Sequence, residues 1–229
     1  MTARTVSAAR RARRGSTFIA LSAAALLAAS CGTGEDSPAA QNEVPPQDTT
    51  SPAEAGGPAD GDAFASAELV DPEGASRGTV TFTETGAGTL VTVDGADLPP
   101  GFHGLHIHSV GVCEPDSESP SEPGERGAFL SAGGHLQGDD ADADHPDHAG
   151  DLPPLFVAED GTARIVTLTD RLEQDLLLDD DGSAVMIHEN SDNLANIPER
   201  YAPDGPDEDT LSAGDGGSRI ACGVVEEVD

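Results

Sequence analysis

The sequence predicts an all-β domain of the antiparallel barrel or sandwich type, in which two long loops interrupt the strands. Short segments with alternating polar and apolar residues recur from residue 65 to residue 225. Turn-forming residues separate these segments, and no long stretch has the periodicity of a helix. Strands that are this short and this numerous are typical of antiparallel barrels and sandwiches.

The strands and loops can be assigned in order along the chain. Residues 78–84 and 89–93 alternate polar and apolar side chains, and residues 85–88 between them predict a hairpin turn. Residues 109–152 and 189–218 are too long and polar to be hairpin turns, and loops of that length in a compact domain are usually functional. The expected strands are residues 65–70, 78–84, 89–93, 103–108, 155–158, 162–168, 183–188 and 219–225.

Residues 1–30 have the pattern of a signal peptide. Residues 1–14 carry five arginines and no acidic residue. The apolar run that follows, residues 18–29, is too short to span a bilayer as a helix, which favours a secretory signal. Arginine pairs within residues 10–14 leave both the Sec and the Tat export routes open.

Cys31 follows a run of small residues that resembles a bacterial lipobox. Ala28, Ala29 and Ser30 precede it, and in this pattern the cysteine is lipidated and becomes the mature N-terminus. We therefore expect an exported protein that lipidated Cys31 anchors to the outer face of the bacterial cell membrane. The alternative is an ordinary cleaved signal peptide in which Cys31 has no role.

The segment after the signal predicts a disordered acidic tether. Residues 31–62 are rich in Ala, Pro, Gly, Ser and acidic residues, with almost no large apolar side chain. Such a segment cannot bury enough surface to offset the entropy of ordering it. Residues 63–229 are left as one folded domain, a size that allows an adequate core.

The charge balance excludes nucleic acid as a partner. The chain has 11 basic residues, all of them arginine, against 43 acidic residues, and its net charge is −32. Removal of residues 1–30 with their five arginines leaves 6 basic residues and a net charge of −37. Phosphate contacts need a basic face, and so large a negative charge favours a solvated surface instead.

Two cysteines lie in the domain, Cys113 and Cys222. Disulfides persist in exported proteins, so a bond between these two is favoured over two free thiols. It would close a loop of about 110 residues, which the chain-entropy model values at about 4–5 kcal/mol.

The histidines predict a metal centre. All seven lie between residues 103 and 188, and His106 and His108 are two positions apart on an expected strand, so their rings project from the same face. Imidazole binds copper and zinc, and zinc also accepts a carboxylate such as that of Asp151. The further candidate ligands are His135, His145, His148 and His188. Their clustering disfavours a set of unrelated surface histidines.

Five short motifs resemble the copper/zinc superoxide dismutase family and occur in the family's order. They are GFHGLHIH at 101–108, SAGGH at 131–135, HAGDL at 148–152, VMIHE at 185–189 and GDGGSRIACG at 214–223. The segment NLANIPERY at 193–201 is similar to the actinobacterial lipoprotein type of this family. The resemblance implies an eight-stranded antiparallel Greek-key barrel or sandwich.

The resemblance also implies the metal ligands and the reaction. The implied copper ligands are His106, His108, His135 and His188, and the implied zinc ligands are His135, His145, His148 and Asp151. The shared ligand His135 would bridge the two metals. Copper redox cycling would convert superoxide into oxygen and hydrogen peroxide, with His135 and solvent supplying protons.

Further residues take roles from the same resemblance. Arg219 attracts and orients the superoxide anion, and Asp192 links a copper histidine to a zinc histidine. Cys113 and Cys222 form the family's disulfide, and His103 is structural.

The zinc ligands depart from the family in their spacing. Only Pro146 and Asp147 separate His145 from His148, whereas family members have a longer stretch there. Either both histidines reach one zinc ion, or the site fails to close and the enzyme is of the copper-only type.

Two other functions compete with dismutation. An exported copper-binding or storage lipoprotein could use the same fold, but it would be expected to lose Arg219 or a copper ligand. An adhesin on the same fold would not need the metal ligands. The expected partners are superoxide and the membrane, and a homodimer is left open.

Overall fold

The alternating segments form strands at the expected places. A computed structural model describes residues 61–228. Each of the eight expected segments coincides with a strand, except that residues 103–108 are divided between two. The main sheet contains β1 (Ala63–Val70), β2 (Ser76–Thr85), β3 (Gly88–Gly95), β4 (Gly101–His103), β5 (Leu105–His108), β8 (Leu155–Val157), β9 (Ala163–Thr169), β10 (Ala184–His188), β11 (Arg219–Val224) and β12 (Glu226–Glu227).

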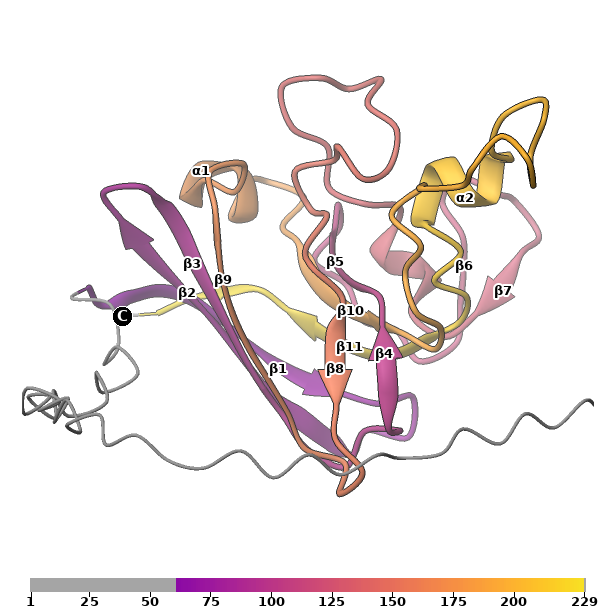
Figure 1. The fold of residues 1–229 in the computed structure, drawn as a ribbon. Coiled ribbons are helices and arrows are strands. Elements are labelled where there is room, and N and C mark those ends of the chain that lie inside the picture. The colour runs from indigo at the N-terminus through magenta and orange to yellow at the C-terminus, as the bar shows by residue number, and fades with distance from the viewer. Residues whose placement is uncertain (1–60, 229) are drawn as a thin grey trace, which may run out of the picture. The chain divides into compact units, whose positions relative to one another are not determined.

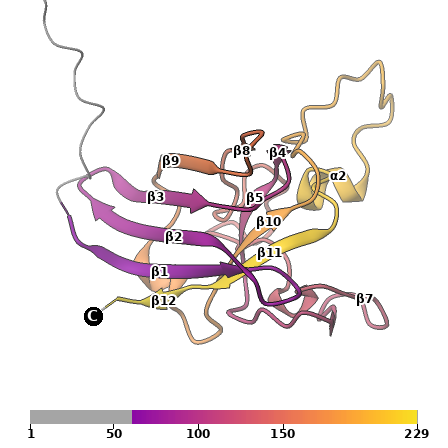
Figure 2. The ribbon, with the colours of Figure 1, turned by 90° about the horizontal axis from the view of Figure 1, so that it is seen from below.

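The main sheet curls into a nearly closed barrel (Figures 1 and 2). Its order is β4-β8-β9-β3-β2-β1-β11-β10-β5, with every pair antiparallel. β4 and β5 stand at opposite ends of this order, yet only Gly104 separates them in the chain. When β4 and β5 count as one strand and the two-residue β12 is left out, the ten strands become eight. From β3 the chain crosses over to β4, three positions away, which is a Greek-key connection.

The barrel core explains why the strand that carries two histidines is buried on both faces. Leu105 and Ile107 of β5 point into the main core and are fully buried. The alternate residues, His106 and His108, point outward and are also buried, because the long loops cover that face. The sequence periodicity of two therefore separates a core face from a site face on the same strand.

The first long loop is held to the barrel by a second, smaller core. Phe129 and Ala132 of the loop pack against Met186 of β10 and Cys222 of β11. A disulfide joins Cys113 in the loop to Cys222, as predicted. The loop also contains the short hairpin β6 (Ser117–Glu118) and β7 (Arg126–Gly127) and the 3-10 helix η1 (Leu130–Ala132).

Two short helices complete the described residues. α1 (Gln174–Leu177) connects β9 to β10, and α2 (Glu208–Ala213) lies in the second long loop. Asp207 caps α2 by accepting a hydrogen bond from the backbone N–H of Thr210. No helix within residues 61–228 is both long enough and apolar enough to cross a membrane. The expected signal peptide, Cys31 and nearly all of the tether lie outside the described residues.

Candidate metal centre

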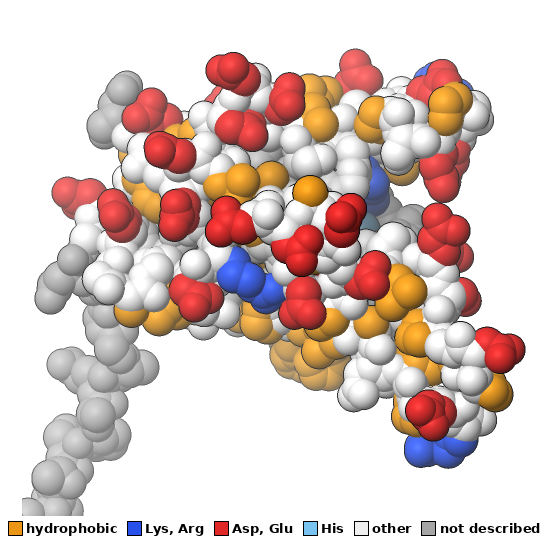
Figure 3. Space-filling view, turned by 90° about the horizontal axis from the view of Figure 1, so that it is seen from above, with side chains coloured by type: hydrophobic (Ala, Val, Ile, Leu, Met, Phe, Trp, Pro, Cys, Tyr) orange, Lys and Arg blue, Asp and Glu red, His pale blue; other side chains and the backbone are white. Residues whose placement is uncertain are grey.

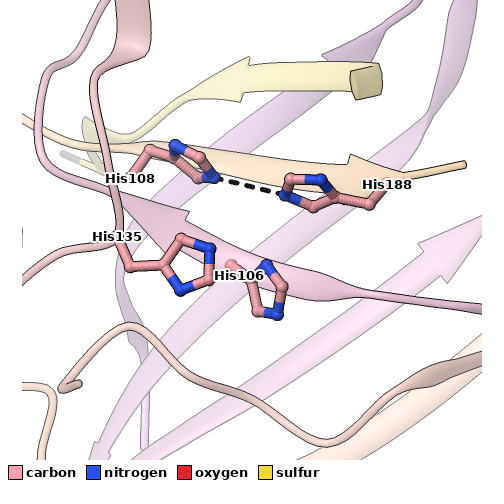
Figure 4. A group of neighbouring side chains, drawn as sticks. All are labelled: His106, His108, His135 and His188. Carbon is pink, nitrogen blue, oxygen red and sulfur yellow. Dashed lines mark hydrogen bonds between the residues drawn. The ribbon is translucent and has the colours of Figure 1, made fainter. Parts of the chain in front are cut away.

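Four imidazoles converge on the outer face of β5 and β10. His106 and His108 come from β5, and His188 ends β10. His135 approaches from the first long loop, where its backbone pairs with that of His108 in an isolated antiparallel β-bridge. Figure 4 shows the four rings turned toward one another. One ring nitrogen from each of these residues lies within 4.8 Å of the others, and all four residues are buried.

The remaining nitrogen of each strand histidine has a hydrogen-bond acceptor. His106 Nε2 donates to Asp192 Oδ2 at 2.8 Å, His108 Nδ1 to the carbonyl of Gly133 at 2.8 Å, and His188 Nδ1 to the carbonyl of Gly217 at 3.1 Å. Such acceptors fix the tautomer and orientation of a metal-binding imidazole.

The inward nitrogens are the ones that lack ordinary partners. His106 Nδ1 and His135 Nε2 are buried without a hydrogen bond, and Nε2 of His108 faces Nε2 of His188 at 3.4 Å. An all-imidazole set with buried, unpartnered nitrogens fits copper.

A second set of ligand atoms surrounds the carboxylate of Asp151. Its oxygens lie 2.7 Å from Nδ1 of His135, 3.1 Å from Nδ1 of His145 and 3.0 Å from Nδ1 of His148. The Nδ1 atoms of His145 and His148 are buried and have no hydrogen-bond partner. Three imidazoles and one carboxylate fit a closed zinc site. Despite their short spacing, the rings of His145 and His148 both reach the carboxylate of Asp151, one at each oxygen.

The four residues whose ligand atoms lie within 4.8 Å of one another here are His106, His135, His145 and Asp151, so His148 stands slightly further from the group. Nδ1 of His106 belongs to the four-histidine group and its Nε2 donates to Asp192, so His148 is the remaining candidate for the fourth position. His135 is then the residue that the two sets share, with Nε2 toward the first and Nδ1 toward the second.

Asp192 connects the two sets by hydrogen bonds to one histidine of each. One carboxylate oxygen accepts from His106 Nε2, and the other accepts from His145 Nε2 at 2.9 Å and from the backbone N–H of Leu194 at 2.7 Å. Burial raises the pKa of Asp192, but the hydrogen bonds of His106 and His145 outweigh it and hold this pKa below its usual range. The side chain is therefore an anion that can accept from both rings at once.

The second long loop approaches this carboxylate so closely that a glycine is required. Gly214, the C-cap of α2, has a φ of 57°, and a Cβ there would collide with the carboxylate of Asp192 and with Nε2 of His145. The backbone N–H of His145 donates to the carbonyl of Leu211 in α2 at 2.7 Å. The two long loops are thus joined at the second set of ligands.

Burial keeps most of the copper-facing imidazoles neutral. It lowers the pKa of His108 and of His188 well below the usual value, with help from neighbouring imidazoles and Arg219. It also lowers the pKa of His135 to about 4, although Asp151 opposes the shift. Neutral imidazole is the form that binds a metal.

The second set, in contrast, favours a positive charge. Burial lowers the pKa of His145, but the hydrogen bonds and charges of Asp151 and Asp192 outweigh it and raise this pKa to about 9. Burial likewise raises the pKa of Asp151, but three imidazoles hold it below its usual range. The two carboxylates therefore favour a positive charge at this point, which a bound cation would supply.

Arg219 lies beside the four imidazoles. Its guanidinium donates to the carbonyl of Phe129 at 2.6 Å and to the carbonyl of Gly133 at 2.7 Å. The Gly133 carbonyl is also the acceptor for His108 Nδ1, so one carbonyl positions both a ligand and the arginine. Burial lowers the pKa of Arg219 to about 10, against the charge of Glu125, so the side chain stays cationic at neutral pH.

His103 is outside both sets. Its Nδ1 lies 2.8 Å from the carbonyl of His188, and its Nε2 lies 2.8 Å from the carbonyl of Pro99. Both nitrogens thus contact the backbone, which suits the structural role expected for this residue.

The carbonyls of Phe129, Gly133 and Gly217 were not predicted from the sequence. A backbone acceptor leaves little signal in a sequence, although Gly133 and Gly217, with φ of 74° and 72°, are glycines where the backbone needs that freedom.

Comparisons with known proteins agree with this geometry. A family model described as copper/zinc superoxide dismutase matches residues 76–225. A protein of Mycobacterium tuberculosis named copper-zinc superoxide dismutase is 48% identical over 157 residues, which cover 64% of this chain and 59% of that protein. An Escherichia coli protein of the same name is 37% identical over 158 residues, or 67% of this chain and 80% of that protein. The chain thus spans less than two thirds of the mycobacterial relative.

A solved structure shows the same fold. The copper/zinc superoxide dismutase of Brucella abortus superposes with a TM-score of 0.55 and 28% identity, covering 71% of this chain and 99% of that one.

Proposed function

The chain belongs to the copper/zinc superoxide dismutase family, and on this premise we propose that it converts superoxide into oxygen and hydrogen peroxide. The observation that carries the proposal is the group of four imidazoles beside a cationic Arg219. Bound copper would supply one-electron redox chemistry at this group. A storage protein would have no use for an arginine beside the metal.

Arg219 attracts and orients the substrate. It is one of 6 arginines among residues 61–228, and acidic side chains are spread over the surface (Figure 3). Its two carbonyl contacts fix the guanidinium beside His108, so the positive charge acts where the superoxide anion must arrive. A fixed charge near a desolvated site attracts an anion more strongly than one in bulk water.

His135 is placed to deliver a proton. Its Nε2 faces the copper group without a hydrogen-bond partner, while Nδ1 is 2.7 Å from Asp151. Nε2 is thus the atom of His135 that can hold a proton on the copper side. The residue can therefore give that proton to the reduced substrate, and solvent supplies the second.

Activity with matched variants tests the proposal. Purified protein supplied with copper and zinc should accelerate superoxide loss, and His188→Ala should abolish the acceleration without unfolding the domain. An unaffected His188→Ala variant would remove the copper assignment.

We propose that lipidated Cys31 anchors the protein to the outer face of the bacterial cell membrane. The lipobox-like residues before Cys31 support it, and so does the Cys113–Cys222 disulfide, which is typical of exported proteins. Labelled fatty acid should be incorporated into the wild-type protein in cells and not into Cys31→Ser. Equal labelling of the variant would refute the anchor.

We propose that a second copy covers the apolar outer face of β4, β8 and β9. Phe102 and Phe156 are 58% and 55% exposed with ring centroids 5.1 Å apart, and Val166 and Leu168 on β9 are about as exposed. Two chains this acidic repel each other, so they can meet only where acidic residues are few. Light scattering should give a dimer for the wild type and a monomer for Phe156→Ser; a monomeric wild type refutes the proposal.

A further inference from the structure

Two arginines of the described residues have backbone carbonyls as partners instead of an acidic or aromatic side chain. Of the six arginines in residues 61–228, three pair with aspartates, and one lies over the ring of Tyr201. Arg219 donates to carbonyls of the first long loop beside the copper group. Arg171 donates to carbonyls of the segment that carries the zinc ligands, and the family resemblance gave it no role.

Arg171 contacts the backbone of the segment that carries the zinc ligands. Its Nη1 donates to the carbonyl of Pro146, the residue after His145, at 3.1 Å. Its Nη2 makes a longer contact of 3.5 Å with the carbonyl of Asp151. One planar guanidinium therefore spans both ends of the segment 146–151, which contains His148.

Arg171 stands on the barrel and not on either long loop. It follows the end of β9, where its backbone N–H donates to Thr169 Oγ1 at 3.2 Å. The next residue, Leu172, is buried in the main core, and its carbonyl accepts from Thr89 Oγ1 of β3 at 2.5 Å. The backbone that carries Arg171 is therefore fixed by the core.

The middle of the ligand segment has few other connections. Pro146 has no N–H, so its carbonyl is its one backbone hydrogen-bonding group. The N–H of His145 bonds to Leu211 in the other long loop, and the carbonyl of Gly150, just beyond this stretch, accepts from the N–H of Ile107 in β5 at 2.9 Å. Within the described residues, Arg171 makes the hydrogen bond that ties residues 145–149 to the barrel.

The charge of Arg171 suits this position as well. Residues 138–148 include five aspartates whose mutual repulsion opposes a compact loop. A guanidinium that reaches two carbonyls of the segment offsets part of that repulsion and keeps two donors in a fixed geometry. A lysine could place one charge there but could not span both carbonyls.

We propose that Arg171 is a positioning residue for the zinc ligands, holding His145 and Asp151 in the arrangement that binds the cation. The inference rests on the proposed zinc site, and it adds a contact from the barrel that acts through the ligand backbone. Outer contacts of this kind typically change metal affinity by about 10- to 100-fold. Arg171 contacts the ligand backbone instead of a ligand side chain and is exposed to solvent, so we expect its loss to weaken zinc binding about tenfold.

The test compares Arg171→Ala, Arg171→Lys and Arg164→Ala in the full-length protein with copper already bound. Arg164 is the matched control, because it is also an exposed arginine of the β9 region but pairs with Asp94, away from the ligands. Zinc affinity is measured by chelator competition. We expect about tenfold weaker binding in Arg171→Ala, a partial recovery in Arg171→Lys and wild-type affinity in Arg164→Ala, with copper content unchanged.

Hydrogen exchange in the metal-free protein tests the role of Arg171 independently of whether the proposed zinc site exists. Amides of residues 138–151 should exchange faster in Arg171→Ala than in Arg164→Ala, whether or not zinc binds. Equal exchange and equal zinc affinity in the two variants would overturn the role of Arg171. A wild type that binds no zinc while the exchange difference persists would refute the zinc site and leave Arg171 as the residue that orders the segment. If Arg171→Ala does not fold, the same comparisons are made with Arg171→Lys.

Discussion

Replacement of Asp192 by Asn should weaken copper binding while leaving the fold intact. The Asp192 carboxylate accepts from His106 Nε2 at 2.8 Å and from His145 Nε2 at 2.9 Å, one ring on each oxygen. An asparagine of the same shape keeps one oxygen acceptor and turns an N–H₂ group toward the other ring. One ring N–H then loses its acceptor and faces a second donor.

The size of the effect follows from that lost bond. A hydrogen bond to a charged group contributes about 1.5–3 kcal/mol. Because about 1.4 kcal/mol is a tenfold change in an equilibrium constant, copper affinity should fall by about 10- to 150-fold. The loss should be greater for copper than for zinc, because the N–H of Leu194 bonds to the same oxygen as His145. The amide oxygen is therefore favoured on that side, and the N–H₂ group then faces His106, a copper ligand.

Chelator competition gives both metal affinities, and circular dichroism confirms that the variant is folded. Asp147→Asn is the control, because Asp147 is an exposed aspartate between His145 and His148, and its loss changes the charge equally. If Asp192→Asn and Asp147→Asn lowered copper affinity equally, general electrostatics would explain the result, and the bridging role of Asp192 would be refuted.

Three further predictions concern the copper side of the site. His106→Ala, like His188→Ala, should lose dismutase activity while keeping its disulfide and its thermal unfolding transition; retained turnover would contradict its place among the ligands. Arg219→Glu should lower the rate constant at low salt by roughly 10- to 100-fold at unchanged copper content, since fixed charge changes encounter rates by such factors. The control Arg126→Glu replaces an exposed arginine on β7 and should leave the rate constant unchanged. Equal rate constants for the two variants would contradict the guidance role of Arg219. Copper affinity should change little between pH 7 and pH 6. Burial lowers the pKa of His135 to about 4, so protons compete with copper for this ring only as the pH falls toward that value. A steep loss of copper affinity between pH 7 and pH 6 in a competition titration would contradict this prediction.

The strands were predictable from sequence because each has a buried and an outward face. The alternation in residues 78–84 and 89–93 is produced directly by that geometry, and β2 and β3 occupy those segments with their hairpin turn at the expected place. The hairpin β6–β7 and the helices α1 and α2 were not predicted. They are too short to show a period and depend on loop contacts, such as the cap that Asp207 provides for α2.

The candidate ligands were predictable from residue type and order, but their grouping was not derivable from the residues alone. The spacing of His145 and His148 left the zinc site undecided, because it does not determine the path of an irregular loop. The structure brings both rings to Asp151 through contacts from Leu211 and Arg171, which lie about 66 and 26 residues away in the chain. No local pattern in the sequence reports contacts of that kind.

The most direct test is dismutase activity measured together with copper and zinc content on the same purified, metal-supplemented protein. We predict about one copper and one zinc per chain and fast removal of superoxide that is lost when copper is removed. Protein that holds copper at the four histidines without accelerating superoxide loss would contradict the proposed function and identify a copper-binding or storage protein on the dismutase fold.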